Sequence, residues 1–220
     1  MKLYIVATPI GNLEDISLRA LRILKEVDLI LCEDTRVTRV LLEKCEIKTP
    51  TLSYFQHSKV GKVNKIIDLL KQGNDLALVS DAGTPGISDP GNKLIQSVLQ
   101  ELPEIKIEPI PGPSAVISAL SISGLPTDKF IFYGFLPHKK GKEKILKEIM
   151  NNKFTSVFYE STHRILKTLT KLQDLGLKKQ IVVCRELTKK FETIYRGDIE
   201  QVLNQLNKDT TKGEFVVVIG

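Results

Sequence analysis

Glycines and prolines recur in a segment that also carries carboxylates. Residues Asp81–Gly91 lie between a buried apolar run and a helical pattern. Glycine permits positive φ and close backbone approach, and proline fixes φ, so this composition predicts a rigid, shaped loop. Asp89 followed by Pro90 fits an N-cap and a first helical position. Capping does not explain Asp81 and Gly83, which follow a strand, where open α/β sheets bind their ligands.

Two further loops occupy equivalent places. Ala7–Asn12 follows the first expected strand, and Pro111–Ala115 follows the strand that ends at Ile110. The chain contains neither a GxGxxG nor a GxxxxGK[ST] motif, so a dinucleotide fingerprint and a phosphate-binding P-loop are not supported. We expect these loops to present backbone groups and carboxylates to a flat ligand that is uncharged or cationic.

Alternating strands and helices must position these loops. In residues 1–124 we expect strands at Lys2–Ala7, Leu29–Glu33, Leu76–Ser80 and Lys106–Ile110, and helices at Ser17–Val27, Thr38–Lys44, Lys62–Gln72, Asn92–Gln100 and Ser114–Ser121. Short connections between such elements predict an α/β domain with a mostly parallel sheet and helices on both faces. The segment Ser123–Pro126 is the best candidate for a domain boundary.

Residues 125–220 predict a second α/β domain. The expected strands are Phe130–Gly134, Thr155–Tyr159, Gln180–Arg185, Phe191–Arg196 and Phe215–Ile219, and the expected helices are Lys142–Met150, Arg164–Leu175 and Ile199–Leu206. Two consecutive strands near Cys184 and Thr193 indicate a hairpin, so this sheet should be mixed.

Charge differs between the two halves. The net charge of the 220-residue chain is +6. Residues 125–220 hold 18 Lys and Arg against 11 Asp and Glu, whereas residues 1–124 hold 14 against 15. A basic second half suits a polyanionic partner, although a lysine-rich composition can also arise without one.

The chain shows no sign of a membrane or an oxidising compartment. No apolar run approaches the roughly 18 residues of a membrane span, and the N-terminal apolar run stops at Thr8-Pro9. The three cysteines form no CxxC pair and lie in or beside apolar segments. We therefore expect a soluble, cytoplasmic protein with reduced thiols and no metal site.

Seven strings along the chain closely resemble one family. They are Tyr4–Asp15, Cys32–Arg36, Ser80–Gly91, Pro111–Ala115, Phe132–Pro137, Tyr159–Arg164 and Arg185–Lys190. In this order they resemble the ribosomal RNA small subunit methyltransferase I family, the cytidine 2′-O-ribose branch of the tetrapyrrole methylase superfamily. The resemblance covers essentially the whole chain. Many family members continue beyond the last strand into a basic segment, whereas the printed chain ends at that strand.

The resemblance implies a homodimeric enzyme that binds S-adenosylmethionine in a cleft between its two domains and acts on 16S ribosomal RNA, with no membrane or metal. Carried over by motif, the cofactor-binding positions are Pro9, Gly11, Asn12, Asp81, Gly83, Ile87, Ser88, Pro113, Ser114, Ala115, Tyr133, Ser161 and Glu186.

Methyl transfer to a ribose hydroxyl needs positioning first and a proton acceptor second. The motifs offer six candidates: Glu33, Asp34, Glu160, Glu186, His163 and Lys189. Asp34 and Glu160 are the predicted catalytic pair because both follow strands. Each also has a structural alternative, since Asp34 could cap the next helix and Glu160 could pair with Arg164 four residues on. For His57 and His138 the sequence shows no partner.

Arginine and lysine side chains could hold RNA phosphates. The predicted RNA-binding residues are Arg36, Arg164, Lys139, Lys140 and Lys189, with Arg185 more suited to organising the site. The run from Lys139 to Lys147 could equally be a solvated helix face.

Three other functions remain open at this point. A small-molecule methylase of the tetrapyrrole type would keep the cofactor and need no basic surface. A non-catalytic RNA-binding module would keep the fold and bind no cofactor. A generic nucleotide-binding protein would require a phosphate loop, which the motifs do not provide.

Overall fold

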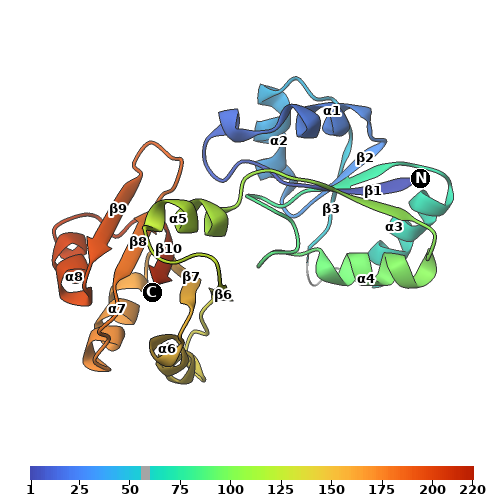
Figure 1. The fold of residues 1–220 in the computed structure, drawn as a ribbon. Coiled ribbons are helices and arrows are strands. Elements are labelled where there is room, and N and C mark those ends of the chain that lie inside the picture. Colours follow the sequence, from blue (N-terminus) through green and yellow to red (C-terminus); the bar gives the residue numbers. More distant parts are fainter. Residues whose placement is uncertain (56–59) are drawn as a thin grey trace. The chain divides into compact units, whose positions relative to one another are not determined.

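The computed structural model describes residues 1–55 and 60–220 (Figure 1). His57 lies outside the described residues. The chain divides into two compact units, Met1–Ser114 and Ala115–Gly220. The boundary was expected at 124/125, after helix α5 (Ala115–Ser123), but it lies before this helix, which belongs to the second unit. In the described part of the chain, none of the helices combines the length and the hydrophobicity that a membrane span requires.

The first unit contains a five-stranded sheet in the order β3-β2-β4-β1-β5, and every pairing in it is parallel. Its strands are β1 (Lys2–Val6), β2 (Leu29–Cys32), β3 (Thr51–Ser53), β4 (Leu76–Leu78) and β5 (Lys106–Ile110). Because the strands are parallel, all their carboxyl ends lie at one edge of the sheet.

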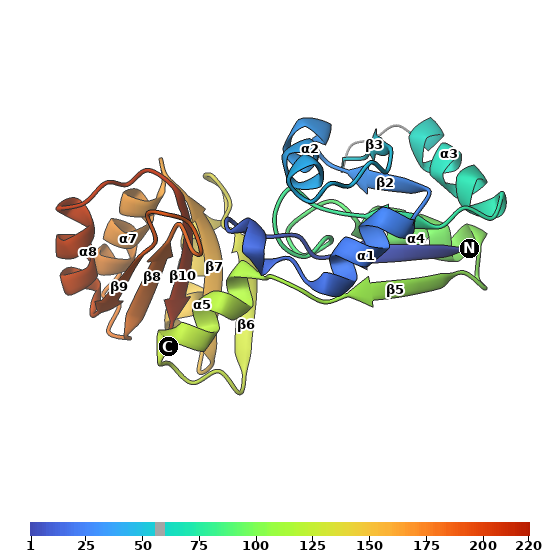
Figure 2. The same ribbon diagram turned by 90° about the horizontal axis from the view of Figure 1, so that it is seen from above.

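Helices cover both faces of this sheet (Figure 2). They are α1 (Leu18–Glu26), α2 (Thr35–Lys44), α3 (Val60–Lys71) and α4 (Asn92–Glu101), with a 3₁₀ turn η1 (Leu13–Asp15) before α1. Tyr4 packs with α1 and α2 in one core, and the neighbouring Leu3 packs with α3 and α4 in another. The alternation of side chains along a strand therefore fills two separate apolar layers.

The predicted mostly parallel α/β unit is confirmed, with local exceptions. The sequence missed β3 and η1. The capping role expected for Asp89 is wrong, because α4 begins at Asn92 and its N-cap is Gly91 at φ 156°. Pro90 consequently lies before the helix rather than in its first turn.

The second unit contains a mixed sheet in the order β6-β7-β10-β8-β9. Its strands are β6 (Phe130–Phe135), β7 (Thr155–Ser161), β8 (Ile181–Arg185), β9 (Thr193–Gly197) and β10 (Glu214–Ile219). Strands β6 and β7 are parallel, whereas the other described pairings are antiparallel. The predicted β8–β9 hairpin and the mixed sheet are both confirmed.

Helices α6 (Lys142–Asn151), α7 (Ile165–Asp174) and α8 (Ile199–Asn207) share one core with Phe158, Val183 and Val217 of this sheet. Helix α5 contacts β10 and β7 on the opposite face (Figure 2). Buried Val216 and Val218 alternate with Val217 along β10 and therefore point toward the α5 side.

Candidate functional site

The predicted loops after β1, β4 and β5 come together at the carboxyl edge of the first sheet. Thr8 and Gly83 form an antiparallel bridge, with N···O distances of 2.9 and 3.0 Å in the two directions. The Thr8 hydroxyl donates to the Ser80 carbonyl at 3.1 Å. The Thr84 hydroxyl donates to the Pro113 carbonyl at 3.3 Å, so the third loop joins the other two.

Glycine is required where these loops approach one another. Gly83 has φ +79°, a conformation that L side chains rarely adopt. A Cβ on Gly112 would lie 3.0 Å from the Cβ of Ala7, so a side chain there would push the loops after β1 and β5 apart. The glycines therefore allow a close, backbone-lined junction.

The predicted cofactor-binding residues of this unit lie in or directly after these loops. Pro9 is buried, Gly11 is exposed, and the Asn12 side chain accepts a 3.1 Å hydrogen bond from the Glu14 N–H. Ile87 is an exposed apolar side chain, 49% accessible. Ser88 has φ 63°, a strained value for a residue with a side chain. Of the remaining positions, Pro113 and Ser114 connect β5 to α5, and Ala115 is the first residue of α5 and belongs to the second unit.

Four carboxylates gather where β2 and β4 end. We call them the acidic cluster: Glu33, Asp34, Asp81 and Asp89. The Asp34 N–H donates to Asp81 Oδ1 at 3.1 Å, which ties the loop after β2 to the loop after β4. The cluster follows from the strand order, since β2 and β4 are neighbours in the sheet.

The environments of these carboxylates differ. Burial and the neighbouring Glu33 raise the pKa of Asp89 to about 6, although a hydrogen bond with Ser80 opposes the shift. Burial and the charges of Asp81 and Asp34 also raise the pKa of Glu33. Hydrogen bonds from the Arg36 side chain and backbone lower the pKa of Asp34 to about 2. The cluster thus favours binding of a cation or a proton.

Asp34 has the structural role that the sequence left open. It is the N-cap of α2, and its Oδ1 accepts the Arg36 N–H at 2.9 Å. The Arg36 guanidinium also pairs with it, with Nη2 2.6 Å from Oδ2. Arg36, predicted to bind RNA, is 88% exposed.

Glu160 lies at the end of β7 with its side chain fully buried. Its Oε1 accepts from the Ser161 N–H at 2.9 Å and from Arg164 Nε at 2.5 Å. Its Oε2 accepts from Thr168 Oγ1 at 2.7 Å and from Lys142 Nζ at 3.1 Å. Burial opposes ionisation, but these hydrogen bonds outweigh it and lower the pKa. The pairing of Glu160 with Arg164 is therefore confirmed.

The other predicted residues of the second unit occupy separate places within it. The Tyr133 hydroxyl donates to Glu148 Oε1 at 3.1 Å. Ser161 ends β7 beside Glu160. Glu186 has φ 51° and accepts from Lys189 Nζ at 2.9 Å, and Lys189 also pairs with Glu214.

Around Glu160 the surface is basic. A hollow of about 430 Å³ is lined by His138, Lys139, Lys142, His163, Arg164, Lys167 and Lys171, and we call it the basic hollow. The structure thus brings together the predicted RNA-binding residues Lys139 and Arg164 with the candidate base His163 and with Lys142 of the predicted basic run. The sequence assigned no role to the other three lining residues, which are His138, Lys167 and Lys171. Lys140 follows Lys139 at the surface. Arg36 belongs to the first unit and Lys189 to the β8–β9 connection.

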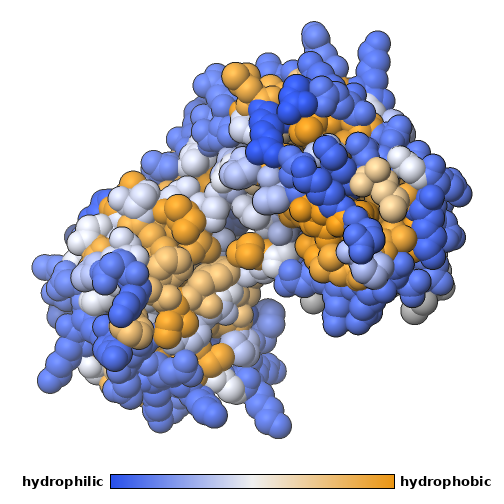
Figure 3. Space-filling view, turned by 45° about the vertical axis from the view of Figure 1, so that its right-hand side comes forward, coloured by the Kyte–Doolittle hydropathy of each residue, from blue (hydrophilic) through white to orange (hydrophobic). Residues whose placement is uncertain are grey.

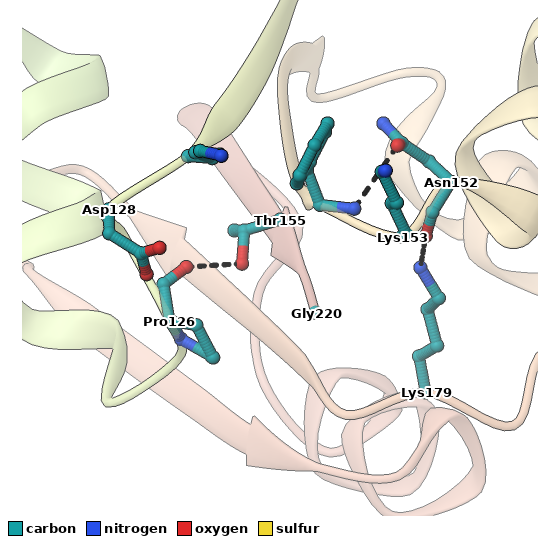
Figure 4. Close-up of a pocket in the computed structure, with 9 residues that line it drawn as sticks. Pro126, Asp128, Asn152, Lys153, Thr155, Lys179 and Gly220 are labelled. Carbon is teal, nitrogen blue, oxygen red and sulfur yellow. Dashed lines mark hydrogen bonds between the residues drawn. The ribbon is translucent and has the colours of Figure 1, made fainter.

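A second hollow of similar volume lies at the opposite ends of β6 and β7. Figure 4 shows Lys179 donating to the Asn152 carbonyl and Thr155 donating to the Pro126 carbonyl. Asp128 also lines it. This hollow is therefore lined by both acidic and basic side chains, and one of its lysines, Lys179, already donates a hydrogen bond to the protein backbone.

Sequence reasoning missed the raised pKa of Asp89 and three basic residues of the hollow, His138, Lys167 and Lys171. For Arg164, Lys167 and Lys171, the signal was a spacing of three and four residues on one helix face. For Asp89 no local signal existed, because its raised pKa comes from burial in the folded chain and from Glu33 at another strand end. No group of three His, Cys, Asp or Glu residues suited to a metal ion occurs in the part of the chain that the structure describes.

Comparison with known proteins gives matches over the whole chain. A model of the tetrapyrrole (corrin/porphyrin) methylases matches residues 2–203. Proteins named ribosomal RNA small subunit methyltransferase I are similar: that of Thermotoga maritima is 44% identical over 99% of this chain and 97% of its own length. The Hydrogenobaculum protein is 47% identical over 100% of this chain and 95% of its own length. The Halalkalibacterium halodurans protein is 46% identical over 99% of this chain and 75% of its own length.

Two solved structures share the fold. A cobalt precorrin-4 methyltransferase of cobalamin biosynthesis has a TM-score of 0.66 at 17% identity and covers 100% of this chain and 94% of its own. The uroporphyrin-III-C-methyltransferase of Thermus thermophilus has a TM-score of 0.64 at 18% identity with the same coverage. These matches support the predicted α/β architecture.

Proposed function

The chain belongs to the tetrapyrrole methylase family, within the ribosomal RNA small subunit methyltransferase I proteins, and from this premise we propose that it methylates 16S ribosomal RNA. The reaction is the transfer of a methyl group from S-adenosylmethionine to the ribose 2′-hydroxyl of a cytidine.

One observation carries this proposal: identity of 44 to 47% extends over 99 to 100% of the chain to relatives that carry the ribosomal RNA methyltransferase name. The tetrapyrrole-type structures are only 17 and 18% identical, and that likeness concerns the fold. The RNA methylase is therefore favoured over the small-molecule methylase.

The first unit fits S-adenosylmethionine chemically. When bound, the cofactor supplies a methyl group on a positively charged sulfur. The joined loops around Thr8, Gly83 and Pro113 offer a backbone surface that a Cβ on Gly112 would disrupt. The nearby acidic cluster favours a cation, and Ile87 offers an exposed apolar surface to a flat ring. We assign cofactor binding to the loop positions carried over by motif, with Tyr133, Ser161 and Glu186 as the contribution of the second unit.

Holding the ribose oxygen in line with the reacting methyl group supplies much of the acceleration. Loops joined by hydrogen bonds suit this task because they lose little freedom when the substrate binds.

The predicted proton acceptors Asp34 and Glu160 lie in a helix cap and in a buried network of cations, and we propose that both act mainly in these positioning roles. Cations hold both carboxylates in their ionised forms, and the Glu160 side chain is fully buried. A base works best with a pKa near the working pH, so the structure gives more support to positioning than to either base.

We also propose that the protein acts as a cytoplasmic homodimer. Exposed apolar side chains on α5 and β6 support an interface in the second unit: Ile117, Ile122, Phe130, Ile131 and Phe135. Figure 3 shows hydrophobic side chains gathered on this unit, at the lower left of the view. Light scattering of the purified chain tests the dimer, and a monomer would contradict it.

The test of the activity is transfer of a radioactive methyl group to small ribosomal subunits from cells that lack this protein, followed by mapping of the modified nucleotide. We expect a single 2′-O-methylcytidine in 16S RNA. Labelling of uroporphyrinogen but not of RNA would support the small-molecule methylase, and absence of cofactor binding in calorimetry would support the non-catalytic module.

A further inference from the structure

The basic hollow occupies the place in the second unit where α/β folds bind ligands. Strands β6 and β7 are the parallel pair of this sheet, and the hollow lies just beyond their carboxyl ends, where α6 and α7 begin. Its described lining consists of basic side chains alone. Neither helix has a side-chain hydrogen bond at its N-cap, so both helix dipoles add to the positive potential.

Buried Glu160 holds two of the basic side chains of the hollow in place through hydrogen bonds. It accepts hydrogen bonds from Lys142 and Arg164, whose side chains are only 17 and 14% exposed. Thr168 bonds to both Glu160 and Lys142 and completes the network. The Nη2 of Arg164 lies 2.5 Å from Glu160 Oε1 as an ion pair and donates no hydrogen bond within the described chain. The floor of the hollow is therefore preorganised.

The remaining basic side chains of the hollow are more exposed. Lys139, His163 and Lys167 are exposed, and Lys171 pairs with Glu143 at the rim. Arg164, Lys167 and Lys171 recur on one face of α7 and span about 10 Å along its axis at 1.5 Å per residue. One phosphate would contact only part of this helix face, whereas successive phosphates of a nucleic-acid strand would contact all of it.

We propose that the basic hollow binds the phosphodiester backbone of the RNA substrate, and that Glu160 is a positioning residue that holds Lys142 and Arg164 for this contact. The proposal rests on the proposed function for the identity of the RNA. It assigns the main polyanion contact to the start of α7 and the segment after β6, rather than to Arg36 or Lys189.

The test is the double variant Lys139→Gln/Lys167→Gln, which removes two exposed cations and leaves the Glu160 network intact. Binding of a 16S RNA fragment and of an unrelated single-stranded oligoribonucleotide is measured over a series of KCl concentrations. We expect about ten-fold weaker binding of both RNAs and a salt slope smaller by about 1.4, since each single-strand phosphate contact contributes about 0.7. Calorimetry should show unchanged affinity for S-adenosylmethionine.

The matched control is Lys65→Gln/Lys208→Gln, which removes two exposed lysines from α3 and the end of α8. An equal loss in this control, or a wild-type salt slope in the first double variant, would overturn the proposal. Binding of inorganic pyrophosphate that leaves the affinity for RNA unchanged would also overturn it, because this result would indicate a small-anion site.

Binding of the unrelated oligoribonucleotide separates this inference from the activity. If the double variant loses RNA affinity while the wild type methylates no 16S RNA, the hollow binds RNA and the proposed function fails. If the wild type methylates 16S RNA and the double variant binds RNA unchanged, the activity stands and the hollow is not the contact.

Discussion

The two units carry opposite charges at corresponding places. At the carboxyl ends of β2 and β4 lie Glu33, Asp34, Asp81 and Asp89, whereas at the carboxyl ends of β6 and β7 lie His138, Lys139, His163 and Arg164. Each position is where an α/β fold binds ligands. The difference indicates that the two units bind different ligands, since the charge of the first unit suits a cationic cofactor and the charge of the second suits a polyanion.

The two places also differ in the environment that each gives to a carboxylate. In the second unit, the single buried carboxylate Glu160 is surrounded by donors, and its pKa is lowered. In the first unit, Asp89 lies among other carboxylates, and its pKa is raised to about 6. The surroundings of Glu160 therefore stabilise its ionised form, whereas the surroundings of Asp89 destabilise its ionised form.

The largest effect is expected from Glu160→Ala. Removing this carboxylate leaves Lys142 and Arg164 partly buried without a counter-charge, a change that typically costs about 3 to 5 kcal/mol. Urea unfolding measures the loss. Glu143→Ala, which breaks exposed ion pairs with Lys147 and Lys171, is the control and should change stability little. Equal stabilities of the two variants would refute the role of Glu160.

Asp89→Asn should change the pH dependence of stability. Its pKa in the folded protein, about 6, exceeds the ordinary 3.8, so the wild type loses stability as pH rises from about 4 to about 6 and does not regain it above. The variant lacks this loss. Its stability should match the wild type near pH 4 and exceed it near pH 8 by on the order of 1 kcal/mol. Thermal unfolding across this range checks the sign, and a variant less stable near pH 8 would contradict it.

Asp81→Asn should weaken binding of the cationic cofactor more than of its neutral product, S-adenosylhomocysteine. One lost charge at a partly solvated site is worth about 1 kcal/mol, or about five-fold in the ratio of the two affinities. Calorimetry with both ligands gives the ratio. Lys25→Gln, on the outer helix α1, should leave it unchanged, and an unchanged ratio in Asp81→Asn would remove the electrostatic argument for the acidic cluster.

The smallest effect is expected from Asp34→Ser. Serine is also a good N-cap, so α2 should keep its start. If Asp34 acts mainly as a cap, single-turnover methyl transfer falls by less than about three-fold, well below the roughly hundred-fold that loss of a general base brings. A hundred-fold fall with unchanged folding would instead establish Asp34 as the base.

Most of the fold could be predicted from the sequence because its signals are local. The apolar runs at Lys2–Val6 and Glu214–Ile219 and the helical spacing of α1 and α7 matched the structure closely. The short strand β3 was missed because three half-buried residues carry too little pattern. The start of α4 at Asn92 was predicted correctly, whereas the capping role of Asp89-Pro90 was wrong because this pair has the composition of a cap without its geometry.

The candidate site was only partly predictable. The Gly and Pro loops were found because their conformational demands appear in single residues, such as Gly83. The sequence left open whether Asp34 is a helix cap or a base, and whether Glu160 is an ion-pair partner or a base. The groups that contact each carboxylate are known only from the structure.

Periodicity, backbone restriction and net charge are properties of local segments, so the two α/β units, the rigid loops at the strand ends and the basic second half could be predicted from the amino-acid order. The folded chain was needed to show that Glu33 and Asp89 share one charged environment and that Glu160 accepts a hydrogen bond from Lys142 beneath a basic hollow. Electrostatic coupling depends on distance in space, and strand order, not position along the chain, sets that distance.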